Sequence, residues 1–458
     1  MSGNCSGVIE SPDAMGISLL QLSACLVAGV SLIVLLTARY RVHAFFALLI
    51  ASFVVGFGAQ LPVPDILNAM KDGFGNIMKS LGFIIVLGTA LGVLLEHTGS
   101  TRVMAAFILR KVGERHAALA VSITGFIVGL PIFCDSGYIV LSGLNKSLAQ
   151  RTGISMAMMA VSLAAGLYSV HCLIPPHPGA TAAAGVIGVD FGKLILTGML
   201  VAIPATMVGY FWASFAGKKI PVTVAEEEVM AEETSQPPSD IKAFLPVVVP
   251  IILIAARSFF TFHSPVVSGW WFSAMLSVGD PVVALSIGAL LAFNCHRRWN
   301  SQTVGHLLQE AAEKAGGILV IIGAGGAFGA VLAASDIARH LSQSLALDGL
   351  GILFPFLITT VLKTAQGSST VAIITAASII QPLLPALGLT TERDRLFAVL
   401  AMGAGSMMIS HVNDAYFWVI TKFSGLETRT MLKVYSVASV LMGLVSLLMV
   451  YLLSLILP

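Results

Sequence analysis

The sequence predicts an all-α polytopic membrane protein with inverted-topology repeats, broken helices and re-entrant hairpins. The first observation is composition: 57% of the 458 residues are hydrophobic and 10% are charged, against about 25% charged residues in a typical soluble domain. Second, apolar runs of membrane-spanning length recur from Ile17 almost to the C-terminus. Third, short segments rich in polar residues, glycine and proline interrupt these runs, in the same order in both halves.

Composition also excludes several classes of protein and of site. The net charge of +2 is close to neutral and gives no argument for nucleic-acid binding. The residues before the first span include Glu10 and Asp13 but no basic residue, so we expect no signal peptide. The five cysteines form no disulfide framework, and no H-x-x-x-H or Cys–His spacing indicates zinc. We therefore expect neither a metal nor another cofactor.

Basic residues set the orientation of the spans, because cytoplasmic loops are enriched in lysine and arginine. The first span, about residues 17–36, ends at Arg39 and Arg41, which places that end in the cytoplasm and the N-terminus outside. The stretch VTVAEEEVMAEETSQPPSD is acidic, contains proline and has no aromatic residue, so we predict a solvated cytoplasmic linker. A later hairpin closes on the same side at Arg297 and Arg298.

A similar unit occurs in both halves of the chain. Residues 68–104 and 307–341 each contain a short amphipathic lead, a Gly-rich apolar span and a polar stop followed by arginine. The first copy enters the membrane from outside and the second from the cytoplasm. Composition alone makes any two Gly-rich helices similar, so the prediction of a duplication depends on the matched order of these features. Inverted repeats are the recurrent architecture of secondary transporters. The predicted division is 1–60 (N-terminal scaffold), 61–216 (first repeat), 217–242 (linker), 243–300 (scaffold) and 301–458 (second, inverted repeat).

Four segments, numbered breaks 1 to 4 in chain order, interrupt apolar sequence at spacings too short for two full spans. They are GLPIFCDSGY (129–138), SVHCLIPPHPGATAAAG (169–185), KTAQGSSTVA (363–372) and SHVNDAYFW (410–418). A helix that stops within a membrane leaves up to about four N–H or C=O groups unpaired. This is tolerated only inside protein or beside a wet cavity. Such segments are the best sequence indication of a transporter site.

The helix after each break offers free N–H groups and the positive end of a helix dipole, which together attract anions. Hydroxyl side chains at these positions cap the helix or donate to a ligand. Residues of this kind are Ser136, Thr181, Ser368, Ser369 and Thr370. For the prolines of breaks 1 and 2 we prefer a structural role in turns. For the hydroxyls of break 3, capping without ligand contact is an equal alternative.

Titratable residues also gather at the breaks. A carboxylate inside a membrane indicates function by default, which applies to Asp135 in break 1 and Asp414 in break 4. Asp414 also suits the N-cap of the helix that follows it. Each histidine alone is better explained as a structural residue that donates to a backbone carbonyl. Taken together with the serines and aspartates, they indicate one polar cavity. The histidines are His171, His177 and His411.

At these motifs the chain resembles the GntP family of gluconate and sugar-acid permeases. The motifs GLPIFCDSGY, PPHPGATA, QGSSTVA and SHVNDAYFW carry the resemblance, GFGNIMKSLGFIIVLGTALG supports it, and it covers essentially the whole chain. It implies proton-driven uptake of small hydroxy-carboxylates across the bacterial inner membrane, by a homodimer whose transport domains make an elevator motion against a scaffold. The chain departs from many gluconate permeases at residues 135–138 and at Ala415 and Tyr416.

The predicted function is import of gluconate or a related small sugar acid by proton symport, with no enzymatic activity. An intramembrane enzyme would need a nucleophile–base pair or a metal set that the sequence does not show. A channel would use repeated pore-lining groups, usually from several subunits. The alternatives kept open are sodium coupling through helix-break carbonyls and a different hydroxy- or amino-carboxylate substrate. The predicted partners are a small anion, the lipid bilayer and a second copy of the chain.

Two sets of residues are assigned to this function. We expect the substrate carboxylate to bind at half-helix N-termini, because the basic residue at the breaks, Lys363, is expected to extend its ammonium to the membrane interface. The predicted proton-coupling residues, one of which takes up a proton that offsets the substrate charge, are Asp414, His411 and His171. The predicted substrate-binding residues are Asp135, Ser136, His177, Thr181, Gln366, Ser368, Ser369, Thr370 and Asn413.

Overall fold

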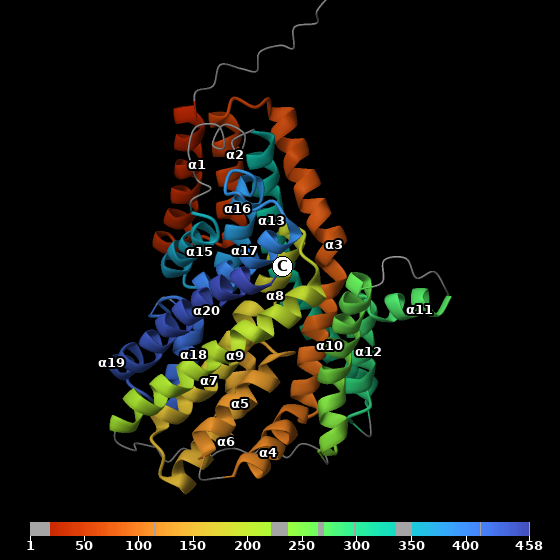
Figure 1. Cartoon of the computed structure of the whole chain (residues 1–458), viewed down its shortest axis with the longest axis vertical. Helices are drawn as coiled ribbons and strands as arrows, with labels where there is room; N and C mark the ends of the chain where they lie inside the picture. The colour runs from red at the N-terminus through yellow and green to blue at the C-terminus, as the bar shows by residue number, and fades with distance from the viewer. Residues whose placement is uncertain are drawn as a thin grey trace, which may run out of the picture.

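Every regular element that the structure describes is a helix. The computed structural model describes residues 19–113, 116–220, 237–263, 270–296, 299–335, 350–412 and 414–457. The predicted all-α class is confirmed for these ranges (Figure 1). Arg297, Arg298 and residues 221–236 of the predicted linker lie outside the described residues.

The helices form three groups along the chain. The first group is α1 (Leu19–Val34), η1 (Leu35–Arg39), α2 (Ala44–Gly58), α3 (Val63–His97), α4 (Ser100–Val112), α5 (Ala117–Gly129), α6 (Cys134–Thr152), α7 (Met156–Leu173), α8 (Pro178–Ile187), α9 (Phe191–Ala216) and η3 (Gly217–Lys219). The middle group is α10 (Asp240–His263), α11 (Trp270–Val278) and α12 (Pro281–Phe293). The last group is α13 (Ser301–Ala334), α15 (Leu353–Gln366), α16 (Ser369–Ile380), η5 (Gln381–Leu383), α17 (Glu392–Met407), α18 (Ala415–Ser424), α19 (Thr428–Met431), η6 (Leu432–Ser436) and α20 (Val437–Ile456).

The first and last groups contain the same order of helices. Each has a long helix (α3 or α13), then two helix pairs separated by short breaks (α5/α6 and α7/α8, or α15/α16 and α17/α18). A long apolar helix, α9 or α20, then follows in each group. This order supports the predicted duplication, while the inverted relation of the two copies stays a prediction.

Five helical segments among the described residues are long and apolar enough to cross a membrane. Their outer surfaces are apolar as well, and α9 shows this along one side. Its exposed large side chains recur every three or four residues, the spacing of one helix face, and that face suits contact with lipid. They are Leu196, Leu200, Ile203, Met207 and Phe211. The five segments are Val63–His97, Met156–Ile187, Phe191–Ala216, Ser301–Ala334 and Thr428–Ile456.

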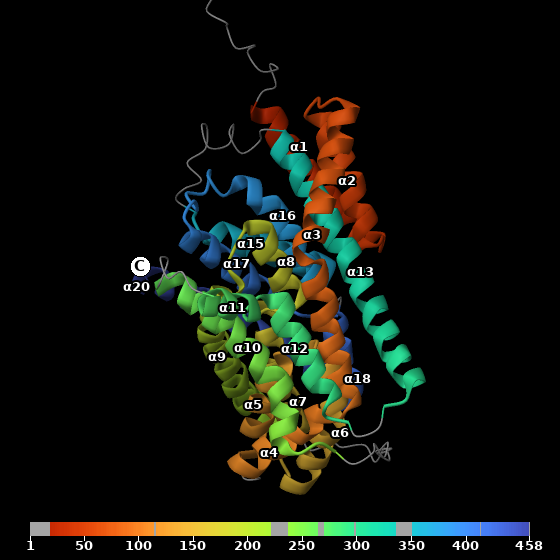
Figure 2. The same cartoon turned by 90° about the vertical axis from the view of Figure 1, so that its right-hand side faces the viewer.

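The long helices α3 and α13 pack against each other in opposite directions (Figure 2). Gly73 of α3 meets the backbone of Gly326 of α13, where a Cβ on Gly73 would lie 2.4 Å from the Gly326 carbonyl oxygen. At the other end of the contact, Glu96 of α3 lies within electrostatic range of Lys314 of α13. In each copy the amphipathic lead and the apolar span form one continuous helix. The opposite directions agree with the predicted inversion.

Several segments predicted to be cytoplasmic lie together. Arg110, near the end of α4, forms a 2.7 Å salt bridge with Asp240 at the start of α10. His97, at the end of α3, packs on His296 and Trp299, with ring centroids 6.0 and 5.9 Å apart. In Figure 1, α4 and the start of α10 lie at the bottom, away from the start of α1 at the top. The side of the membrane that this end faces stays a prediction.

Candidate functional site

All four predicted breaks interrupt helices in the structure. Break 1 separates α5 from α6 at residues 130–133, and break 2 separates α7 from α8 at residues 174–177. Break 3 consists of Gly367 and Ser368, and Gly367 has a φ of 79°, a left-handed conformation that favours glycine. Break 4 separates α17 from α18 at residues 408–414. Asn413, within break 4, lies outside the described residues.

Histidines join break 2 to breaks 1 and 3. The buried His177 places its Nε2 2.6 Å from the carbonyl oxygen of Gly129, the last residue of α5. The Nε2 of His171, in the last turn of α7, lies 3.3 Å from the hydroxyl of Thr370 in the first turn of α16. The two imidazole rings are neighbours, with centroids 4.8 Å apart. His177 therefore has the structural contact expected of a lone histidine, and His171 links the two halves of the chain.

Two further contacts join break 4 to breaks 3 and 1. Lys363, one turn before Gly367, forms a 2.6 Å salt bridge with Asp414. Tyr138 of α6 meets Tyr416 of α18 edge to face, with ring centroids 6.2 Å apart. The four breaks are thereby connected in a closed ring that draws on both halves of the chain.

The Lys363–Asp414 pair is buried, with side chains that are 0% and 6% exposed. The Lys363 Nζ also donates to the carbonyl oxygen of Gly367 at 2.9 Å. The expectation that Lys363 extends to the membrane interface is therefore wrong. The physical reason is that a carboxylate left alone in such a place would be costly, and an open helix-end carbonyl gives the ammonium a second partner.

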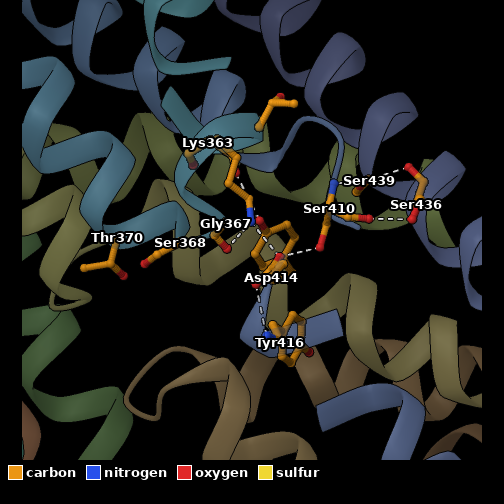
Figure 3. A network of polar contacts seen from close by, with 12 residues as sticks. Lys363, Gly367, Ser368, Thr370, Ser410, Asp414, Tyr416, Ser436 and Ser439 are labelled. Carbon is orange, nitrogen blue, oxygen red and sulfur yellow. Dashed lines mark hydrogen bonds and ion pairs between the residues drawn. The ribbon is translucent and has the colours of Figure 1, made fainter. Parts of the chain in front are cut away.

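The Asp414 carboxylate is fixed by two groups besides Lys363. Its Oδ1 accepts from the backbone N–H of Tyr416 at 3.0 Å, which confirms the predicted N-cap of α18. Its Oδ2 accepts from the hydroxyl of Ser410. Ser410 is held in turn, because its backbone N–H donates to Ser439 and its carbonyl accepts from Ser436. In Figure 3, Lys363 and Asp414 extend toward each other between these serines and the start of α16.

The first turns of α8 and α16 lie against each other. A Cβ on Gly179 of α8 would lie 3.3 Å from the Cα of Thr370 in α16. Ser368 caps α16 by accepting from the backbone N–H of Val371 at 3.3 Å. Two adjacent helix starts with unsatisfied polar groups form an arrangement suited to a polar anion. The side-chain atoms near them without a partner among the described residues are Nδ1 of His171, the hydroxyl of Thr181 and both amide atoms of Gln366.

Three other predicted residues border the Lys363–Asp414 pair or the start of α16. Asp135, in the first turn of α6, interacts electrostatically with both Lys363 and Asp414. His411 is half-buried in break 4, and its carbonyl oxygen accepts from the backbone N–H of Asp414 at 2.8 Å. Ser369 is buried in the first turn of α16. The structure thus brings residues of breaks 1, 3 and 4 around one ion pair.

Ser136 has different surroundings from the other predicted residues. It lines a small cavity against α3 and α13, which Thr89, Glu96 and Lys314 also line. Its neighbour along the chain, Asp135, instead interacts with the ion pair. The first turn of α6 therefore presents polar groups to two separate places.

Lys363 is the candidate that the sequence interpretation missed. A signal was present, because an intramembrane carboxylate needs a partner and Lys363 is the basic residue within the four break motifs. The tyrosines around the pair had no such signal, since aromatic residues in apolar helices are ordinarily core residues. Tyr168, for example, is buried against Tyr416 and donates to the carbonyl oxygen of Ser406 at 3.0 Å.

Comparison with known proteins agrees with this architecture. Residues 20–456 match the GntP family permease profile. The chain is 35% identical to a gluconate permease of Pseudomonas aeruginosa, over 94% of this chain and 97% of that protein. It is 30% identical to the D-serine transporter DsdX of Escherichia coli, again over 94% and 97%. Its fold resembles the YdaH transporter of Alcanivorax borkumensis, with a TM-score of 0.62 over 87% and 90% of the two chains at 18% identity.

The sequence matches extend over the apolar helices and all four breaks, so they cover the whole of the candidate site. The structural likeness to a transporter agrees with a helical fold whose outer surface is apolar. The protein is a multi-pass inner-membrane permease, not an enzyme, and belongs to the GntP family.

Proposed function

We propose that the protein imports gluconate or a related small sugar acid by proton symport, through elevator-type alternating access. The observation that carries the proposal is the meeting of two half-helix starts, α8 and α16, beside buried polar atoms without partners in the described part of the chain. A gluconate permease among the relatives supports the substrate class. The second candidate is another small carboxylate, such as an amino acid, which the D-serine transporter among the relatives supports.

In the proposed complex, the substrate carboxylate lies at the starts of α8 and α16, close to Ser368, Ser369 and Thr370. Free N–H groups at such positions bind anions through hydrogen bonds and through the helix dipole. Thr181 and Gln366 form hydrogen bonds with the substrate hydroxyls, because a hydroxyl and an amide both donate and accept hydrogen bonds. The other proposed binding residues are Asp135, Ser136, His177 and Asn413.

Proton coupling is proposed at Asp414, His411 or His171. A carboxyl or imidazole that takes up one proton with each substrate offsets the substrate charge during crossing. Sodium held by backbone carbonyls of the breaks is the alternative, since such a site depends little on side-chain types. The two coupling ions are distinguished by the gradients used in the uptake experiment below.

The proposed moving part comprises the two repeats, residues 61–216 and 301–458, and the proposed scaffold and homodimer contact lie in residues 1–60 and 243–300. An apolar cavity at the boundary supports this division, because a loosely packed boundary allows relative motion. It lies between the prolines of breaks 1 and 2 on one side and helices α10 and α12 on the other. Its lining includes Pro131, Pro175, Pro176, Val247, Ile251 and Leu285.

Purified protein in liposomes is expected to accumulate labelled gluconate when an inward proton gradient is imposed. A sodium gradient alone is expected to give no accumulation. Unlabelled galactonate, fructuronate, glycerate and D-serine serve as competitors that define the substrate class. Sodium-driven uptake would contradict proton symport but would still show that the protein transports gluconate. Accumulation of labelled D-serine with no accumulation of labelled gluconate would favour the second candidate over the first.

Replacing Thr181 by valine is expected to raise the KM for gluconate by about 2- to 10-fold, the range of one lost hydrogen bond. Stability should be unchanged or higher, because the buried hydroxyl has no partner among the described residues. Uptake kinetics and the thermal unfolding midpoint check the two expectations. Thr375→Val is the matched control, since Thr375 is equally buried and also lacks a described partner. A KM increase of the same size in both variants would contradict a binding role for Thr181.

A further inference from the structure

We propose that Lys363 alternates between two anionic partners: the carboxylate of Asp414 in the empty carrier and the carboxylate of the substrate in the loaded carrier. Protonation of Asp414 releases Lys363 to the substrate. The inference rests on the proposed function and adds the residue that couples the proton to the anion. It is carried by the buried ion pair that connects breaks 3 and 4.

The position of the ammonium allows this exchange. Lys363 Nζ donates to Asp414 at 2.6 Å and to the carbonyl oxygen of Gly367 at 2.9 Å. Gly367 immediately precedes Ser368, the N-cap of α16, so the ammonium lies at the helix start where the substrate carboxylate is proposed. The imidazole of His171, which contacts Thr370 in the same turn, interacts electrostatically with Lys363. The ammonium therefore contacts Asp414 and lies beside the helix start where the substrate carboxylate is proposed to bind.

Asp414 keeps its structural role when it is protonated. Its Oδ1 still accepts from the N–H of Tyr416, so α18 remains capped. The new proton on Oδ2 is donated to the hydroxyl oxygen of Ser410, because a hydroxyl that donates in one state accepts in the other. The proton comes from the aqueous side with the substrate and leaves with it, and no other covalent bond changes. What Asp414 loses is its attraction for Lys363.

The exchange keeps the charge of the site constant. In the empty carrier, Lys363 and Asp414 sum to zero. In the loaded carrier, Lys363 and a monoanionic substrate sum to zero, and the protonated Asp414 is neutral. The balance requires Asp135, which interacts with both members of the pair, to keep the same charge in both states. Because net charge within a membrane is costly to move, one proton per monoanion gives an electroneutral carrier in both directions.

Other titratable groups face the pair from the neighbouring helices. Asp135 interacts with both members of the pair, which makes it the competing proton acceptor and requires a variant in the test. Among the described residues, the cysteines and tyrosines around the pair interact electrostatically with Asp414, and no hydrogen bond joins them to Lys363. The described groups on the neighbouring helices are Asp135 and Cys134 from α6, Tyr168, His171 and Cys172 from α7, and Tyr435 from η6.

The test measures gluconate counterflow and proton-driven gluconate accumulation in liposomes, each normalised to the amount of folded protein. Asp414→Asn is expected to keep counterflow at both acidic and alkaline pH but to lose accumulation, because Lys363 is free at every pH. Lys363→Met is expected to lose counterflow by about 10- to 100-fold, the range of a lost charged hydrogen bond. The double variant is expected to behave like Lys363→Met. Asp135→Asn is expected to change both activities in the same proportion.

If the ion pair is purely structural, both single variants lose counterflow and the neutral double variant regains it. This result would overturn the inference. Selective loss of accumulation in Asp135→Asn, with Asp414→Asn still accumulating, would also overturn it. The wild-type uptake rate should not change when the membrane potential is clamped with potassium and valinomycin, and a potential-dependent rate would refute the exchange. Wild-type protein without any gluconate counterflow would refute the proposed function itself, and the inference with it.

Discussion

Replacing Lys363 by methionine is expected to lower the stability of the protein by about 3–5 kcal/mol, the range for a buried charge that loses its partner. The pair is 0% and 6% exposed, so little water reaches the Asp414 carboxylate once the ammonium is gone. Methionine retains a flexible apolar stem of similar length, which keeps the effect of lost packing small. The measurement is the thermal unfolding midpoint in detergent micelles at neutral pH.

The double variant Lys363→Met, Asp414→Asn is expected to recover most of this loss. Neither of the two substituted positions then carries a buried charge, and asparagine still caps α18. Lys193→Met is the matched control, because Lys193 forms a salt bridge of similar length, 2.7 Å, with Glu392. Those side chains are 32% and 55% exposed, so the control should lose less than about 1 kcal/mol. Equal losses for Lys363→Met and Lys193→Met would show that burial is not the cause.

Replacing Gly166 by alanine is expected to separate α7 from α5 and to abolish most transport. A Cβ on Gly166 would lie 2.2 Å from the carbonyl oxygen of Ser122 and 2.6 Å from the backbone nitrogen of Phe126. These are backbone atoms, so no side-chain rotation relieves the clash and α5 must move. Overpacking of this kind costs about 1–3 kcal/mol. Displacement of α5 also pulls Gly129 away from His177 and opens the contact between breaks 1 and 2.

Gly316→Ala is the matched control for Gly166→Ala. Gly316 lies within α13, and a Cβ there meets no atom within 4 Å. The alanine should therefore raise stability by about 0.5–1 kcal/mol through the lower backbone entropy of the unfolded chain. The initial uptake rate and the unfolding midpoint of both variants are compared with those of the wild type. Wild-type values for Gly166→Ala would mean that the α5–α7 contact relaxes without disturbing the site.

The positions of the four breaks could be predicted because each is a local property of the sequence. Glycine, proline and hydroxyl residues within an apolar run stop a helix wherever the rest of the chain lies. The N-cap role of Asp414 was predictable for the same reason, since the cap bonds a backbone group two residues away. The family followed from the same motifs, which occupy the breaks.

The sequence by itself thus determined the helical membrane class, the places where helices stop and the residue types found there. Only the tertiary structure decided which break meets which. His171 and Thr370 are 199 residues apart, and Lys363 and Asp414 are 51 apart. No local pattern encodes such pairs, because they depend on how whole helices pack. From the sequence alone, an ammonium at the membrane interface is the state of lower free energy for Lys363. Only packing against break 4 supplies the carboxylate that makes burial of this lysine stable.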